Sequence, residues 1–267
     1  MITAPRPKQT RAWRARRAKL IAAGLVALLA AGCQSRSPET TGSIGGPRIS
    51  PREADALAER YAADPNDLGL AMRYAQALRA TEQRAQATAV LQQAALRNPR
   101  NAAVLGAYGK SLVEVGRFQE AQDVLQNAHS PAQPDWRVLS AQGSAADQLG
   151  DRARAQGFYE AALKIRPNEP SVLSNLGLSY ALGKELDRAE ETLRLAVSQP
   201  GADARVRGNL ALVLGLKGRF PEAEALLRRD LSPAEAEANL ASLRSLAAQP
   251  SRRKAADAVG AAKQTPG

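Results

Sequence analysis

The sequence has few aromatic residues and a single cysteine, and both shortages restrict the kind of protein it encodes. Phe, Trp and Tyr make up 4% of the 267 residues, although 44% are hydrophobic. Because alanine is abundant in that hydrophobic fraction, the composition favours close packing of helices over a sandwich of sheets. With Cys33 as its only cysteine, the chain forms no intramolecular disulfide.

The signatures of the common enzyme classes are absent as well. The sequence contains no glycine-rich phosphate loop, no nucleophile elbow and no spaced set of metal ligands. Its only histidine, His129, has no cysteine or acidic cluster beside it, so we interpret it as a surface residue at a helix end. Acidic pairs such as Glu190-Glu191 are typical of solvated helix faces. The sequence predicts a protein that is not an enzyme and that uses no metal or cofactor.

Acidic residues are missing from the N-terminal segment, and this explains most of the formal net charge of +11. Residues 1–32 contain seven basic residues and no acidic one, so removing them leaves +4. The last eighteen residues account for three more positive charges, which leaves +1 for residues 33–249. Because the body of the chain is nearly neutral, the charge gives no support to nucleic acid as a partner.

The basic segment has the features of an export signal. It precedes an apolar run of twelve residues, 20–31, which is shorter than the roughly 20 residues that a membrane-spanning helix needs and fits a signal peptide over residues 1–32. The run ends Leu28-Leu29-Ala30-Ala31-Gly32-Cys33, which resembles a bacterial lipobox. The resemblance implies cleavage between Gly32 and Cys33 and acylation of Cys33, with chains such as palmitate, which anchor the protein to a membrane.

One residue departs from the lipobox pattern. Ala30 stands where such signals more often have leucine, so ordinary cleavage after Ala30 or Ala31, with Cys33 left as a free thiol, is the alternative. Gln34 replaces the aspartate that retains many lipoproteins in the inner membrane. In a Gram-negative host the resemblance therefore implies the periplasmic face of the outer membrane. Residues 33–50, dominated by Ser, Thr, Gly and Pro, predict a flexible tether.

The middle of the chain repeats every 34 residues. Five units fit without insertion or deletion: 68–101, 102–135, 136–169, 170–203 and 204–237. Position 8 of the units is always alanine or glycine: Ala75, Gly109, Gly143, Gly177 and Ala211. Position 20 is always alanine: Ala87, Ala121, Ala155, Ala189 and Ala223. Because two helices approach closely only where the facing side chains are small, each unit predicts a helix pair.

The repeats are flanked by partial units. A half-repeat, 51–67, precedes them, and Asp230 occupies a position that is alanine in the other four units, which is typical of the end of an array. Ser232 has the spacing of a capping box and opens a closing helix, whose remainder after the fifth unit is 238–248. We expect the basic tail, 249–267, to be disordered.

The repeating unit resembles the tetratricopeptide repeat (TPR), most clearly at Leu176-Gly177-x-x-Tyr180 and Arg117-Phe118-x-x-Ala121. The resemblance covers about 170 residues. It implies an all-α fold: a right-handed α-solenoid of about five tandem TPR helix pairs, with an N-terminal half-repeat and a C-terminal capping helix. Stacked pairs of this kind form a concave surface lined by the first helix of each unit.

We expect protein partners to bind in that groove. Asn175 and Asn209 occupy position 6 of the fourth and fifth units, and an Asn amide can both donate to and accept from a peptide backbone. The alternative is that they are filler, because the other three units have Arg or Ala there. Four leucines at positions 9 and 13 favour an amphipathic helix or hydrophobic peptide as ligand, unless they are buried between helices: Leu178, Leu182, Leu212 and Leu216.

Two segments near the C-terminus carry a narrower resemblance. The stretches 218–224 (GRFPEAE) and 230–240 (DLSPAEAEANL) look like the end of the TadD family of tight-adherence (Flp) pilus assembly proteins. This resemblance implies an outer-membrane TPR lipoprotein that, like a pilotin, supports the localisation or assembly of a secretin. The alternative is a periplasmic lipoprotein adaptor for cell-wall enzymes or for outer-membrane protein insertion. A nucleic-acid-binding role would require residence in the cytoplasm, which the signal peptide contradicts.

Overall fold

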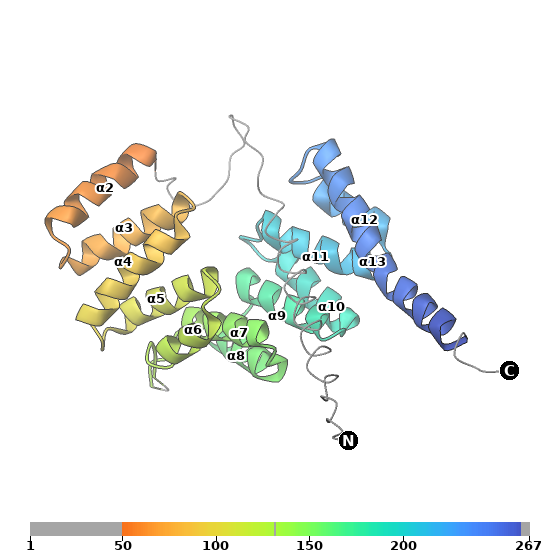
Figure 1. Ribbon diagram of the computed structural model, residues 1–267, viewed down its shortest axis with the longest axis horizontal. Coiled ribbons are helices and arrows are strands. Elements are labelled where there is room, and N and C mark those ends of the chain that lie inside the picture. The colour runs from red at the N-terminus through yellow and green to blue at the C-terminus, as the bar shows by residue number, and fades with distance from the viewer. Residues whose placement is uncertain (1–49, 131, 263–267) are drawn as a thin grey trace, which may run out of the picture. The chain divides into compact units, whose positions relative to one another are not determined.

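The computed structural model describes residues 50–130 and 132–262. This part of the chain contains twelve helices, α2 to α13, and no strand. Consecutive helices pack against one another in chain order (Figure 1). The all-α fold predicted from the sequence is therefore confirmed. The predicted signal peptide, Cys33 and nearly all of the predicted tether lie outside the described residues.

The first helix of each unit begins at the first residue of the 34-residue repeat. These helices are α3 (Leu68–Ala80), α5 (Ala102–Glu114), α7 (Trp136–Leu149), α9 (Pro170–Leu182) and α11 (Ala204–Leu216). Four of them follow an Asp or Asn whose side-chain oxygen accepts a hydrogen bond from a backbone N–H of the first turn: Asp67, Asn101, Asp135 and Asp203. The remaining helix, α9, begins at Pro170, whose fixed φ suits a first turn.

The second helix of each unit follows after a short turn. These helices are α4 (Arg84–Arg97), α6 (Phe118–Leu125), α8 (Arg152–Ile165), α10 (Leu186–Ser198) and α12 (Phe220–Leu227). In every unit the turn contains one residue with positive φ, and it is always position 15: Glu82, Gly116, Gly150, Lys184 and Gly218. The turn geometry is thus the same in all five units, although only three of them place glycine there.

The small residues at position 8 let the two helices of a unit approach closely. A Cβ added to Gly143 would lie 2.6 Å from Cε1 of Tyr159, and one added to Gly177 would lie 2.6 Å from Cγ of Leu193. Tyr159 and Leu193 both occupy position 24, on the second helix. The five alanines at position 20 are completely buried. The repeated small residues therefore mark the contact between paired helices, as the sequence predicts.

Additional helices cover both ends of the repeats. At the N-terminal end, α2 (Pro51–Ala63) packs on α3, and the rings of Tyr61 and Tyr74 lie 5.4 Å apart. At the C-terminal end, α13 (Pro233–Ala262) packs against both α11 and α12. The predicted capping box forms at its start, because the Ser232 N–H donates to Glu235 Oε2 at 3.0 Å and the Glu235 N–H donates to Ser232 Oγ.

The closing helix is longer than the sequence predicts. It continues through residue 262, so the predicted end at 248 is wrong, and most of the segment 249–267 that we expected to be disordered is helical. Proline at 250 removes one backbone donor, but the residues after it are mainly alanine, arginine and lysine, which have high helix propensity. Within the described ranges, no helix is both long enough and apolar enough to span a membrane.

Candidate functional site

The first helices of neighbouring units form a continuous surface. In addition to packing on its own second helix, α7 contacts both α5 and α9, and α9 contacts α11. Positions 2, 6, 9 and 13 of each unit fall on one side of the first helix, because they follow the spacing i, i+4, i+7, i+11. We call these positions the first-helix face. It contains all six predicted groove residues.

The two predicted asparagines connect neighbouring first helices. Asn175 Nδ2 donates to Ser140 Oγ at 3.3 Å, and Asn209 Nδ2 donates to Ser174 Oγ at 2.8 Å. Ser140 and Ser174 both occupy position 5, so the same hydrogen bond is repeated one unit apart. Asn209 is only 5% exposed, and it uses its amide donor within the chain. Asn175 is half-buried, and its Oδ1 lies 3.5 Å from the guanidinium of Arg205.

Ser140 and Ser174 were not predicted from the sequence as part of this face. The signal was available, because position 5 is Ser in the third and fourth units and position 6 is Asn in the fourth and fifth. Reading it required knowing that position 5 of one unit faces position 6 of the next unit.

The four predicted leucines differ in their exposure. Leu212 is 7% exposed and lies among the buried residues of α11. Leu178, Leu182 and Leu216 are half-buried. These three side chains give the C-terminal half of the first-helix face an apolar character, which suits contact with apolar side chains of a protein partner.

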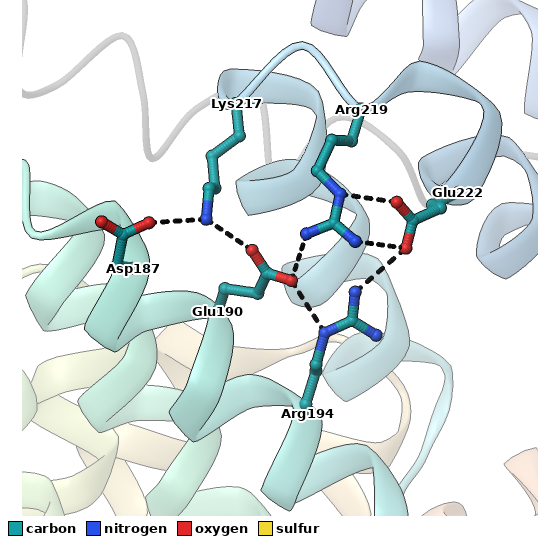
Figure 2. Close-up of polar contacts among 6 residues, drawn as sticks. All are labelled: Asp187, Glu190, Arg194, Lys217, Arg219 and Glu222. Carbon is teal, nitrogen blue, oxygen red and sulfur yellow. Dashed lines mark hydrogen bonds and ion pairs between the residues drawn. The ribbon is translucent and has the colours of Figure 1, made fainter.

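A network of six charged side chains joins the fourth unit to the fifth (Figure 2). At its centre, Glu190 of α10 accepts hydrogen bonds from Lys217 Nζ at 2.6 Å, Arg219 Nη1 at 2.5 Å and Arg194 Nε at 2.8 Å. The outer carboxylates are Asp187, which pairs with Lys217, and Glu222, which pairs with both arginines.

The network keeps its central carboxylate ionised. Burial raises the pKa of Glu190, which is 8% exposed, but hydrogen bonds from Lys217, Arg194 and Arg219 outweigh burial and lower that pKa to about 2. A carboxylate with three cationic donors is not a proton acceptor at neutral pH. We therefore assign the network to the stability of the unit interface.

His129 is more enclosed than the surface position predicted from the sequence. It lies in the segment after α6 and is half-buried, with Nε2 3.2 Å from Oε1 of Gln142. In the described ranges, no group of three or more His, Cys, Asp and Glu side chains is placed to hold a metal ion.

Comparisons with protein families identify the repeat. Residues 51–128 match the family described as anaphase-promoting complex, cyclosome, subunit 3, and residues 137–169 match the tetratricopeptide repeat. No curated protein matches the chain.

Solved structures extend the similarity over most of the chain. A TPR protein of Thermus thermophilus, TTC0263, is 21% identical with a TM-score of 0.59, over 66% of this chain and 98% of that one. Pseudomonas aeruginosa PilF is 21% identical with a TM-score of 0.53, over 72% of this chain and 89% of PilF. PilW, described as a widely conserved type IV pilus biogenesis factor, is 17% identical with a TM-score of 0.58, over 84% and 98%.

At these identities the similarity establishes the fold. The chain has the tetratricopeptide-repeat fold, and the solenoid predicted from the 34-residue period is confirmed. Tetratricopeptide repeats imply a scaffold for protein–protein interaction, with proteins as its partners.

Proposed function

We propose that this chain is an outer-membrane lipoprotein that acts in assembly of a tight-adherence (Flp) pilus, with a pilotin-like role in localising or assembling a secretin. The observation that carries the proposal is the first-helix face, which is continuous over neighbouring units and combines half-buried leucines with polar side chains. A surface of this kind suits an extended or helical segment of another protein.

Two further features support the pilus assignment. The segments 218–224 and 230–240 resemble the TadD family, and the structure forms them into α12 and the capped start of α13. The fold of PilW, a type IV pilus biogenesis factor, is similar over 84% of this chain. A secretin is built at the outer membrane, so a lipid anchor at Cys33 would hold the scaffold beside it.

The test is a crosslinking pull-down from outer membranes of the native host, comparing the wild-type protein with Cys33→Ser and identifying captured proteins by mass spectrometry. We expect a secretin or a pilus subunit with the wild type and a loss of that protein with Cys33→Ser. Circular dichroism of the two proteins should match, since Cys33 precedes the repeats.

Other outcomes contradict the proposal in distinguishable ways. Capture of wall hydrolases or outer-membrane insertion factors would replace the pilus assignment with the adaptor role. If Cys33→Ser stays in the membrane fraction without a captured partner, the lipid anchor is wrong. If the wild type captures no protein, the proposed function fails as a whole.

A further inference from the structure

Charge is distributed unequally between the two sets of helices. The five first helices contain six basic and two acidic residues, whereas the five second helices contain seven basic and eight acidic residues. The first helices therefore carry a net charge of +4 and the second helices −1. The near-neutral total of the repeat region conceals this difference.

Most of the basic side chains on the first helices have no carboxylate partner within the described residues. Arg79 pairs with Glu114, with Nε 2.7 Å from Oε2, and Arg207 pairs with Asp230 at 2.6 Å. The other four basic residues are exposed, form no ion pair in the described part of the chain, and all belong to the first-helix face: Arg73, Lys110, Arg137 and Arg205. Glu114 is the only acidic residue of that face, and its carboxylate already pairs with Arg79.

Cations from four different helices act on one region of the face. The Lys110 side chain is exposed, yet partial burial of its amine lowers the pKa of that amine. The positive charges of Arg79, Arg137 and Arg205 lower the pKa further, whereas the negative charge of Glu114 raises it. These arginines belong to α3, α7 and α11. Like charges gathered in this way repel one another, so the arrangement stabilises nothing within the chain. It is complementary to a negatively charged ligand.

The remaining residues of the face distinguish between two kinds of negatively charged ligand. Proteins that bind single-stranded nucleic acid stack bases on aromatic side chains. None of the twenty positions of the first-helix face is aromatic, and its C-terminal half contains Leu178, Leu182 and Leu216. Cations and leucines on one face match a polypeptide that carries both carboxylates and apolar side chains.

We propose that the first-helix face binds an acidic segment of a partner protein, with carboxylates on Arg73, Lys110, Arg137 and Arg205 and apolar side chains on the leucines. This inference rests on the proposed scaffold function and specifies the chemistry of the partner. Packed helices lie about 8–10 Å apart, so a segment that crosses the face from α3 to α11 spans at most about 40 Å, which about twelve extended residues cover.

The test uses a fluorescein-labelled peptide of about twelve residues, long enough for that path, made of glutamate with leucine at every fourth position. Its controls are the same peptide with glutamine in place of glutamate, and an oligothymidylate of equal length. Fluorescence anisotropy measures binding to the purified chain.

The structure supplies a matched pair of double variants. Lys110→Glu with Arg137→Glu changes the first-helix face, whereas Lys164→Glu with Arg154→Glu makes the same charge change on α8, a second helix. All four side chains are exposed. Each arginine also lies over a neighbouring ring, Arg137 over Trp136 at 4.5 Å and Arg154 over Phe158 at 5.4 Å, so the two variants lose equivalent contacts. Circular dichroism melting checks that both remain folded.

We expect the first-helix-face variant to weaken binding of the acidic peptide at least about tenfold, and the α8 variant less than about twofold. Raising the salt from about 0.1 M to about 1 M should also weaken it, because the screening length falls from about 10 Å to about 3 Å. If the face variant unfolds, Arg205→Glu on α11, with Arg154→Glu as control, tests the same face.

Several results would overturn the inference. They are an equal loss with both double variants, no binding of the acidic peptide to the wild type, or tighter binding of the oligothymidylate. A pull-down of the native partner with the wild type and the face variant separates failure of the acidic-segment inference from failure of the scaffold function. If the face variant captures the same partner as the wild type, the scaffold function stands and the acidic-segment inference falls.

Discussion

Lys184 shows how the repeat imposes its geometry on individual residues. It adopts a φ of 66°, because position 15 of every unit takes a positive φ whichever residue occupies it. For a residue with a side chain, this left-handed conformation costs about 1–2 kcal/mol. The neighbouring Gly183 has a φ of −76°, so the glycine that appears in this turn does not relieve the strain.

Replacing Lys184 by glycine should therefore stabilise the chain by about 1 kcal/mol, which urea denaturation would measure. Lys164→Gly is the matched control, because Lys164 is exposed in the last turn of α8 and glycine there should destabilise by up to about 1 kcal/mol. Two changes of the same chemistry should have opposite signs. Destabilisation by both would show that the left-handed turn carries no strain.

For the two groove asparagines, the sequence predicts the position on the helix but not the hydrogen-bond partner. The 34-residue period predicts that Asn175 and Asn209 share one side of consecutive helices, and both lie on the first-helix face. It does not predict that Asn209 donates to Ser174, since that contact depends on how one unit is rotated against the next. The same rotation brings the cations of four helices together, which the net charge of the chain conceals.

The helix pairs depend on the absence of a side chain at position 8. We expect Gly143→Ala to destabilise the chain by about 1–3 kcal/mol, because the new methyl group would overlap the ring of Tyr159. Gly157→Ala is the control: Gly157 lies in α8, and a Cβ there meets nothing within 4 Å. That change should stabilise by about 0.5–1 kcal/mol. Equal effects in thermal or urea denaturation would mean that close approach does not govern position 8.

The contact between the fourth and fifth units depends on the charge of Glu190 (Figure 2). Glu190→Gln removes that charge from three cationic donors and should destabilise by about 1–2 kcal/mol at neutral pH, since the cations are partly solvated. Glu191→Gln is the control, because Glu191 is an exposed neighbour on the same helix. It should change stability by less than about 0.5 kcal/mol.

The pH dependence of this effect follows from the direction of the pKa shift. The pKa of Glu190 is lowered from 4.5 to about 2, so its contribution is fully present above pH 4.5 and is lost as the pH falls toward 2. Urea denaturation of the wild type and Glu190→Gln from pH 7 to pH 3 should give a constant difference down to about pH 4.5 and a smaller one below it. A difference that grows with acid would contradict this assignment.

The elements of the chain are more predictable than their ends. The period, the small residues at positions 8 and 20, and the capping box at Ser232 all describe contacts within about 34 residues, and the structure forms each of them. The predicted end of α13 is wrong because proline at 250 is a strong local signal against helix. The alanine-rich sequence after that proline favours helix more strongly than the proline disfavours it.

At the scale of the whole molecule, repetition makes the fold predictable because each unit contacts mainly its neighbours. The partner is harder to derive, because binding depends on side chains from several units at once. In the function proposed above, a partner protein of the pilus machinery lies on the first-helix face, across neighbouring units.

Site-specific photocrosslinking in the native host shows which protein lies on this face. A photoreactive amino acid replaces Leu178, half-buried on the first-helix face, or Leu195, which is 43% exposed on α10. Mass spectrometry identifies the protein attached at each position. We predict a secretin or pilus component crosslinked from Leu178 and not from Leu195. Crosslinking of that component from Leu195 alone, or of unrelated proteins from Leu178, would show that the pilus partner does not bind the first-helix face.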